Sequence, residues 1–249
     1  MKKYELTSEC ITDIYGRKMY RIKALRDFGN IKQGTLGGFI EKEENLAHNG
    51  KAWVYDNALV YGNAKVYGNA RVYDNAKVHG SARIYGDAEV RDDAEVSCNA
   101  EVFGRAIVLD GANVTGDALV YDDARICEKA NVGYYAKVFG DASVRGDAMI
   151  VDNAEVCGDA SVYGNAEIRG DARVNGYADY AAIKGLGSHH RDMTFFRGKN
   201  EKIYVACGCF YGDLEEFRTK VKATYHGNNK YAKEYLMAAD LMEMHFKKD

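Results

Sequence analysis

The sequence contains no proline and one tryptophan, and its six cysteines lack the spacing of a disulfide framework. The absence of proline fits a chain with few irregular loops. The cysteine pattern excludes a small disulfide-stapled fold and indicates free thiols in a reducing compartment. No apolar run is long enough to span a membrane, and the first residues lead into no signal-peptide core. We therefore expect a soluble, cytoplasmic protein with no membrane partner.

Charge of one sign is also missing, because the net charge is −3 and the pI is near 6.1. Lysine and arginine alternate with glutamate and aspartate and form no basic stripe, so we expect no nucleic-acid partner. Threonine is scarce as well: Thr115 is the only one between Lys51 and Ala182. This excludes the flat threonine arrays of ice-binding or mineral-facing surfaces.

A strict six-residue repeat fills residues 51–182. The segment divides into 22 blocks without an insertion. The second position is alanine in all 22 blocks, and the fourth is valine or isoleucine in 21, with Tyr180 as the exception. The first position is Asn or Asp in 15 blocks, and the sixth is Gly or Asp in 18. A fixed period of this kind indicates a repeat architecture.

Each block reads as one short strand followed by one corner. Positions two and four are apolar while positions three and five are polar or aromatic, which is the period of a strand with one buried face. Gly, Asn and Asp then supply the backbone angles of a turn. A helix is excluded, because it needs apolar residues at a 3.6-residue period.

The phase of the pattern resembles the hexapeptide-repeat proteins, in which an aliphatic residue is followed four positions later by a small one. Val60 and Ala64 fit this rule, as do Val66 and Ala70. The resemblance implies a mainly β fold: a left-handed parallel β-helix with three blocks per coil and about seven coils. The stacked coils would bury a continuous core of valine and alanine.

With three blocks per coil, the outward fifth positions form columns along the helix. One column is aromatic in five consecutive coils: Tyr67, Tyr85, Phe103, Tyr121 and Phe139. The alternative is a ladder that only stabilises neighbouring strands. We favour an oligomer interface, because an exposed apolar strip usually marks one. Relatives with this repeat pack as trimers, and a flat ladder would also serve a two-fold dimer.

Residues 1–50 do not repeat and are expected to form an N-terminal β cap. Two strands are predicted, Tyr4–Thr7 and Lys18–Leu25, with a turn at Tyr15–Arg17. Glycines at 34, 37 and 38 match neither the Walker pattern nor the dinucleotide fingerprint, so we interpret them as turn residues. A cap is needed because the end strand of a solenoid is otherwise unpaired.

Residues 183–249 are predicted to form a ββαα module. The two strands are Met193–Arg197 and Lys202–Cys207. A capping box at Asp213 and Glu216 starts a helix that ends near Gly227, and Asn228 or Asn229 caps a second helix.

Acyl transfer is the first candidate chemistry. The opening segments YRIKALRDFG, GGFIEKEENL and KAWVYDNA resemble hexapeptide-repeat proteins of phages and prophages, which are often labelled putative acyltransferases. That resemblance implies acetyl-CoA as cofactor and a histidine base, and His79 is the only histidine of the repeat. No loop leaves the coil to shape a coenzyme cleft, so we do not expect an enzyme.

A metal site is also not expected. Histidine and cysteine gather in the C-terminal module, but the only paired spacing is a single Cys-x-Cys, which is a weak signal for zinc. If Cys207 and Cys209 lie on one strand, both side chains face the same way. The residues considered are His189, His190, Cys207, Cys209 and His226.

Ligand binding is the reading we favour. A polar group lies where the repeat ends, and Arg191 there would hold a phosphate or carboxylate. The candidate residues are Ser188, His189, His190, Arg191 and Thr194. We therefore expect a non-enzymatic, homo-oligomeric binding protein of phage type in the bacterial cytoplasm. It would antagonise host defence by sequestering a small phosphorylated or nucleotide ligand or by blocking a host protein. The alternatives are an acyltransferase and a rigid scaffold.

Overall fold

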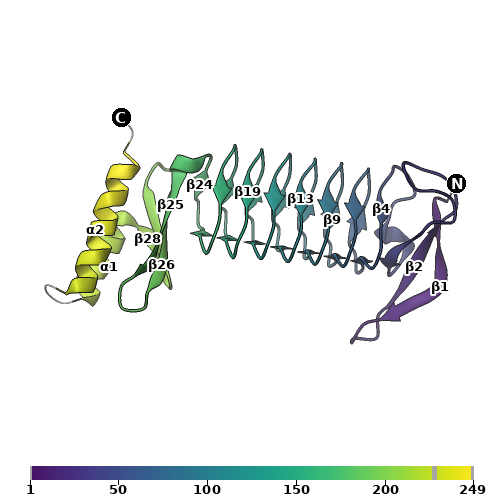
Figure 1. The fold of residues 1–249 in the computed structure, drawn as a ribbon, viewed down its shortest axis with the longest axis horizontal. Coiled ribbons are helices and arrows are strands. Elements are labelled where there is room, and N and C mark those ends of the chain that lie inside the picture. Colours follow the sequence, from purple (N-terminus) through teal and green to yellow (C-terminus); the bar gives the residue numbers. More distant parts are fainter. Residues whose placement is uncertain (1, 226–228, 248–249) are drawn as a thin grey trace.

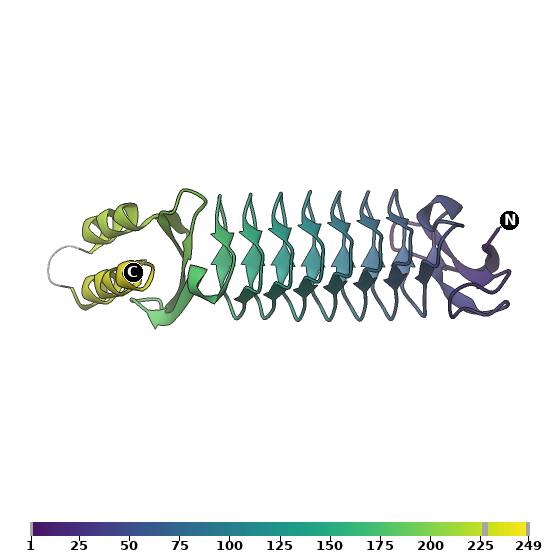
Figure 2. The same ribbon diagram turned by 90° about the horizontal axis from the view of Figure 1, so that it is seen from above.

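The computed structural model describes residues 2–225 and 229–247. The chain forms a straight rod of stacked coils, with a β hairpin at the N-terminal end and a sheet with two helices at the other (Figures 1 and 2). The predicted fold class is confirmed: the protein is mainly β and is built on a parallel β-helix.

The repeat forms three flat parallel sheets, which are named here by their place in the coil. The first sheet contains β5 (Leu59–Val60), β8 (Lys77–Val78), β11 (Glu95–Val96), β14 (Asn113–Val114), β17 (Asn131–Val132), β20 (Met149–Ile150) and β23 (Glu167–Ile168). The second contains β4 (Trp53–Val54), β7 (Arg71–Val72), β10 (Glu89–Val90), β13 (Ile107–Val108), β16 (Arg125–Ile126), β19 (Ser143–Val144) and β22 (Ser161–Val162). The third contains β6 (Lys65–Val66), β9 (Arg83–Ile84), β12 (Glu101–Val102), β15 (Leu119–Val120), β18 (Lys137–Val138), β21 (Glu155–Val156) and β24 (Arg173–Val174).

The core of the rod is a column of alanine and valine or isoleucine. Each strand of the repeat pairs with the strand three blocks further along the chain, so Glu89 lies between Arg71 and Ile107. Positions two and four of the blocks point inward, and Ala100 and Val102 are completely buried. Alanine at position two leaves room for the turn of the chain, while the branched residue at position four fills the coil centre.

The corners repeat one backbone conformation. The sixth residue of the blocks has a positive φ, between 48° and 76° from Asp56 to Gly170. Glycine accepts these angles without strain, and aspartate is among the side chains that tolerate them best. Several corner aspartates also accept a hydrogen bond from the next coil, as Asp110 does from the backbone N–H of Glu128 at 3.1 Å. The hexapeptide therefore specifies its own turn.

The N-terminal segment joins the helix earlier than residue 51. Strands β1 (Tyr4–Thr12) and β2 (Lys18–Ala24) form the predicted antiparallel hairpin, and β2 pairs with β3 (Leu36–Ile40). Strand β3 then pairs in parallel with β5, and Leu46, which follows the 3-10 turn Glu43–Asn45, bridges to Val66. The first sheet thus has eight parallel strands, which corresponds to about eight turns of helix.

A buried lysine closes this end of the core. Lys3 is completely buried, and its Nζ donates a hydrogen bond to the Ala52 carbonyl at 2.7 Å and lies 5.0 Å from the ring centroid of Phe28. Burial, together with the nearby charge of Arg26, lowers the pKa of Lys3 from 10.5 to about 8. The N-terminal cap therefore holds an amine that loses its proton near pH 8.

Stability should consequently rise with pH between 7 and 9.5. Over this range the unfolded chain keeps the lysine proton while the folded chain releases it, so deprotonation favours folding. With the pKa of Lys3 lowered to about 8, the free energy of unfolding should increase by about 2 kcal/mol. Urea unfolding of the wild type and Lys3→Met at several pH values measures this. The variant should lack that increase, and parallel curves for the two proteins would contradict the prediction.

The C-terminal module contains two more strands than predicted. Its sheet runs in the order β25 (Tyr180–Leu186), β26 (Arg191–Arg197), β27 (Ile203–Cys207) and β28 (Phe210–Asp213), all antiparallel. The 3-10 turn Tyr177–Asp179 connects it to the last coil. Among the described residues, no helix is long and apolar enough to cross a membrane.

Two helices, α1 (Leu214–Thr224) and α2 (Lys230–His245), lie against the outer face of this sheet (Figure 1). Asp213 and Glu216 form the predicted capping box, and Asn229 caps α2 by accepting from the N–H of Tyr231 at 2.8 Å. The predicted helix end at Gly227 and the alternative cap Asn228 lie outside the described residues. The other face of the sheet covers the last coil, because Phe196 and Ala206 belong to the core of the rod.

Candidate functional site

The third sheet carries the aromatic column expected from the repeat, and we call it the ladder face. Successive rings lie parallel, with centroids 4.8–4.9 Å apart and interplanar angles of 0–5°. The rings are half-buried, because each covers the next and leaves its edge to solvent. The members are Tyr67, Tyr85, Phe103, Tyr121 and Phe139. The stacking stabilises the coils and also presents a flat apolar strip.

A second column runs beside the rings, at the third position of the same blocks. It consists, in coil order, of Lys65, Arg83, Glu101, Leu119, Lys137, Glu155 and Arg173. Arg83 and Glu101 form an ion pair at 2.5 Å, and the Tyr85 hydroxyl donates to Glu101 at 2.9 Å. The ladder face is therefore an apolar stripe next to a charged stripe of mixed sign.

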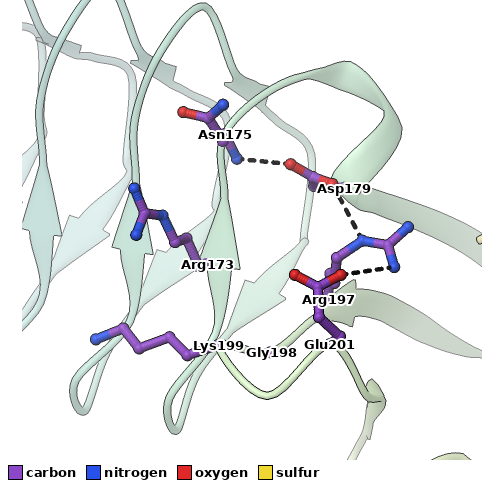
Figure 3. Close-up of a pocket in the computed structure, with 7 residues that line it drawn as sticks. All are labelled: Arg173, Asn175, Asp179, Arg197, Gly198, Lys199 and Glu201. Carbon is purple, nitrogen blue, oxygen red and sulfur yellow. Dashed lines mark hydrogen bonds and ion pairs between the residues drawn. The ribbon is translucent and has the colours of Figure 1, made fainter.

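A cleft of about 430 Å³ lies at the C-terminal end of the ladder face (Figure 3). It forms where the last coil meets the module, because Arg173 and Asn175 end the two columns while the β26–β27 turn folds back over them. Lys199 of that turn donates its backbone N–H to the Asp171 carbonyl at 3.0 Å, which fixes the turn against the coil. The lining residues are Arg173, Asn175, Asp179, Arg197, Gly198, Lys199 and Glu201.

The cations of the cleft have different surroundings. Arg197 is held by Asp179 at 3.3 Å and Glu201 at 3.6 Å and donates to the Phe246 carbonyl at 2.9 Å. The side chains of Arg173 and Lys199 point away from this cluster (Figure 3). Lys199 also lies 3.0 Å from Glu155. The cleft therefore has a structural arginine at its back and two outward cations at its mouth.

Burial sets the chemistry of the thiol beside this cleft. Cys157 occupies the column position after Phe139 and is almost fully buried. Burial raises the pKa of the Cys157 thiol, and the Arg173 guanidinium beside it opposes that shift. The thiol donates to the Asn175 side chain at 3.2 Å. A protonated, buried thiol is a packing group and not a nucleophile.

A second hollow, of about 500 Å³, lies at the other end of the ladder face. It is bounded by the first coil and by Lys65 and Tyr67, with His48 at its edge. His48 accepts a hydrogen bond from the backbone N–H of Lys3 at 3.2 Å and stacks on Tyr4 at 4.4 Å. These contacts make His48 part of the N-terminal cap. The ladder face therefore runs from one hollow to another.

Comparisons with known proteins agree with the repeat. The YdcK β-solenoid repeat model matches residues 64–80. The chain is a hexapeptide-repeat protein. It is 38% identical over 63 residues to the "Uncharacterized acetyltransferase YdcK" of Escherichia coli strain K12. This similarity covers 22% of the chain and 19% of the relative. The chain thus matches less than a fifth of that protein, and the activity in its name is not carried over with the fold.

The residues predicted to bind a ligand do not lie together in one site. Ser188, His189 and His190 form the exposed turn between β25 and β26. Arg191 reaches over the turn at Gly208. Thr194 is buried, and its hydroxyl accepts the backbone N–H of Glu167 at 3.0 Å, which caps the last coil. The cleft lies at the expected junction but is lined by other residues.

The residues considered for a metal site are also separated. Cys207 ends β27 and is buried, whereas Cys209 lies in the following turn and is exposed. The expectation that both thiols face the same way was wrong, because Gly208 adopts a positive φ of 60° and breaks the strand between them. His226 lies outside the described residues. Within the described part of the chain, no three metal-ligating side chains come together.

His79 points outward on the first sheet, as predicted. Its ring stacks on Tyr61 at 4.9 Å, and its Nε2 lies 2.8 Å from a carboxylate oxygen of Glu95 in the next coil. The pair is a histidine with an orienting acid, an arrangement that general-base catalysis can use. Sequence reasoning missed Glu95, although its place one coil beyond His79 follows from the period of the repeat.

Proposed function

We propose that this protein is a non-enzymatic, homo-oligomeric binding protein that assembles through the ladder face. The observation that supports this most strongly is the uninterrupted stack of five rings on a flat sheet. Aromatic residues are enriched at interfaces, where their large area is buried at low cost in side-chain entropy. Neither other sheet carries a comparable column. On the first sheet, outward Tyr61 and His79 give way to Ser97, and on the second sheet Tyr55 and Tyr73 give way to Arg91.

The ligand we propose is a small phosphorylated molecule held in the C-terminal cleft. Arg173 and Lys199 supply charge-assisted donors at its mouth, which suits a phosphate better than a neutral group. In a phage setting the protein would withdraw a nucleotide signal from host defence. Blocking a host protein on an exposed face is the other form of this role.

The double substitution Tyr85→Lys/Phe103→Lys should split the assembly into single chains. Two like charges in the middle of the strip would have to be desolvated on association, which is costly for unpaired lysines. Native mass spectrometry measures the state directly. The matched control is Tyr55→Lys/Tyr73→Lys, which makes the same change in adjacent coils of the second sheet. If the ladder variant stays assembled, or the wild type is a single chain, the proposed interface is wrong.

Native mass spectrometry with added nucleotides also tests the cleft. Arg173→Ala should weaken binding of a nucleotide panel by about tenfold or more, since a charge-assisted hydrogen bond contributes about 1.5–3 kcal/mol. Arg191→Ala is the matched control on the neighbouring turn. Loss of binding in Arg191→Ala alone would instead support the residues predicted from sequence. An assembly that binds no nucleotide would leave the rigid scaffold as the better reading.

The second candidate function is acyl transfer from acetyl-CoA. It is favoured by the contact of 2.8 Å between His79 and Glu95 and by the name of the E. coli relative. His79 would act as general base, and Glu95 would orient its ring. Acetyl-CoA hydrolysis or transfer should then fall by about 10²-fold or more in His79→Ala. Equal background rates in the wild type and the variant would remove this candidate.

A further inference from the structure

We propose that two copies pair through the ladder face in antiparallel order, with the two-fold axis at β15. This pairing would close a composite anion site at each end of the interface. The inference rests on the proposed self-association and adds its orientation, its register and a ligand site that neither copy completes alone.

Symmetry limits how two such faces can meet. If the axis runs along the strands, the copies are antiparallel and each column lies over itself in reverse order. If the axis runs along the rod, the copies are parallel and each residue lies at the same height as its copy. When that axis lies over the ring column, the parallel order also brings rings onto rings, but the two charged columns then lie on opposite sides of the axis and do not meet. With the axis at β15, the antiparallel order places Phe103 opposite Phe139 and Tyr121 opposite its own copy, while Tyr85 faces Cys157 and Tyr67 faces Asn175. It also places the two charged columns opposite each other.

The charged column is complementary to its own reverse. The third sheet has seven repeat strands, so full overlap places Leu119 of β15 on the axis, facing the same residue of the second copy. Arg83 then faces Glu155, and Glu101 faces Lys137. Arg83 and Glu101 already pair within one chain at 2.5 Å, and Glu155 lies 3.0 Å from Lys199. The result is a cluster of three cations and two carboxylates on each side of the axis. A parallel assembly with any number of copies cannot produce these pairs, because it places each residue at the same height as the same residue of every other copy.

The ends of the column do not match in this way. Lys65 at one end faces Arg173 at the other, which brings two cations together beside Lys199 at the mouth of the cleft. Lys65 also borders the N-terminal hollow, so the hollow of one copy meets the cleft of the other. Like charges at this spacing repel unless an anion lies between them. A phosphate or phosphorylated molecule bridging the two chains would satisfy both cations, and the dimer would present two such sites.

Cysteine cross-linking tests the orientation. The exposed thiols Cys10, Cys98 and Cys209 are first replaced by serine, and single cysteines are then placed in the charged column. A short bismaleimide is the suitable reagent, because packed sheets lie about 10 Å apart and facing residues are too distant for a disulfide. Leu119→Cys should cross-link to itself. Arg173→Cys should not, since six coil spacings separate the two copies of this position by about 29 Å.

The matched control is a mixture of Arg173→Cys with Lys65→Cys, which should cross-link although neither variant does so alone. Self-linking of Arg173→Cys would overturn the antiparallel order. Failure of Leu119→Cys in a protein that is still a dimer by native mass spectrometry would overturn the register. A monomeric wild type would instead refute the self-association on which this inference rests, so the two failures are distinguishable.

Inorganic phosphate probes the composite site. Millimolar phosphate should tighten the dimer of the wild type by at least tenfold, and chloride at equal ionic strength should not. Lys65→Ala and Arg173→Ala should each abolish the phosphate effect, because the site draws one cation from each copy. A phosphate effect that survives in both variants, or no effect in the wild type, would overturn the composite site.

Discussion

Replacing Phe196 by alanine should lower the free energy of unfolding by about 4 kcal/mol and loosen the last coils of the rod. The ring is completely buried and faces the end of the helix core, with Tyr204 and Tyr211 stacked beside it at 6.3 Å. Truncation of a buried phenylalanine leaves a cavity that the stiff coil cannot fill. Hydrogen exchange should show faster opening at β23 and β24, and the uncovered strand edges should promote association in irregular aggregates.

Phe195 provides the matched control. It is equally buried and adjacent in sequence, but it points to the opposite side of the sheet and contacts Phe217 of α1. Phe195→Ala should lose similar stability, yet the faster exchange should appear in α1 and α2 and not in the coils. The same exchange pattern in both variants would contradict the separation of the two cores.

Gly38→Ala should destabilise the N-terminal cap by about 3 kcal/mol. A Cβ on Gly38 would lie 2.6 Å from the carbonyl oxygen of Ala58 and 2.7 Å from that of Tyr55. Both oxygens belong to the backbone of the next coil, so neither moves without breaking the parallel pairing of β3 with β5. Thermal unfolding followed by circular dichroism should show a lower midpoint or a separate early transition.

Gly133→Ala is the control for this substitution. Gly133 lies at an outward position of the same sheet, and its added Cβ would meet only side-chain atoms at ordinary contact distances, the nearest being the Thr115 methyl at 3.4 Å. The change should be neutral or slightly stabilising, because alanine restricts the unfolded chain more than glycine. A comparable loss of stability in both variants would show that backbone freedom, and not the close approach at β3, decides the cost.

The rod itself was predictable because one rule repeats. An alanine and a branched residue point inward in every block, and a Gly or Asp turns the chain, so the columns follow from counting three blocks at a time. The same counting predicted the stack from Tyr67 to Phe139. It did not find the first coil, because the pairing of Phe39 with Leu59 does not keep the spacing of the later coils, and the period of the pattern is broken there.

Only part of the cleft could be predicted from the sequence. Arg173 and Asn175 belong to a block of the repeat, so its period places them on the ladder face, but Lys199 arrives through a turn between two antiparallel strands, which has no periodic signal. Strand β25 was missed for a related reason: it runs from the last hexapeptide into a glycine-rich segment that reads as a connector. Long-range packing of the module on the last coil, and not local propensity, decides these positions.

The coil period has a consequence for the distance between the two hollows of the ladder face. Each coil contacts only its neighbours, so the rod behaves as a ruler marked in steps of about 4.8 Å. Duplication or loss of one three-block coil would move the hollows apart or together by one step and would leave both caps unchanged. It would also change the number of strands in the third sheet from seven to an even number. A central symmetry axis would then fall between two strands and no longer on Leu119. The distance between the two hollows can therefore change only in whole coils. Any partner that spans both hollows must match one of these fixed lengths.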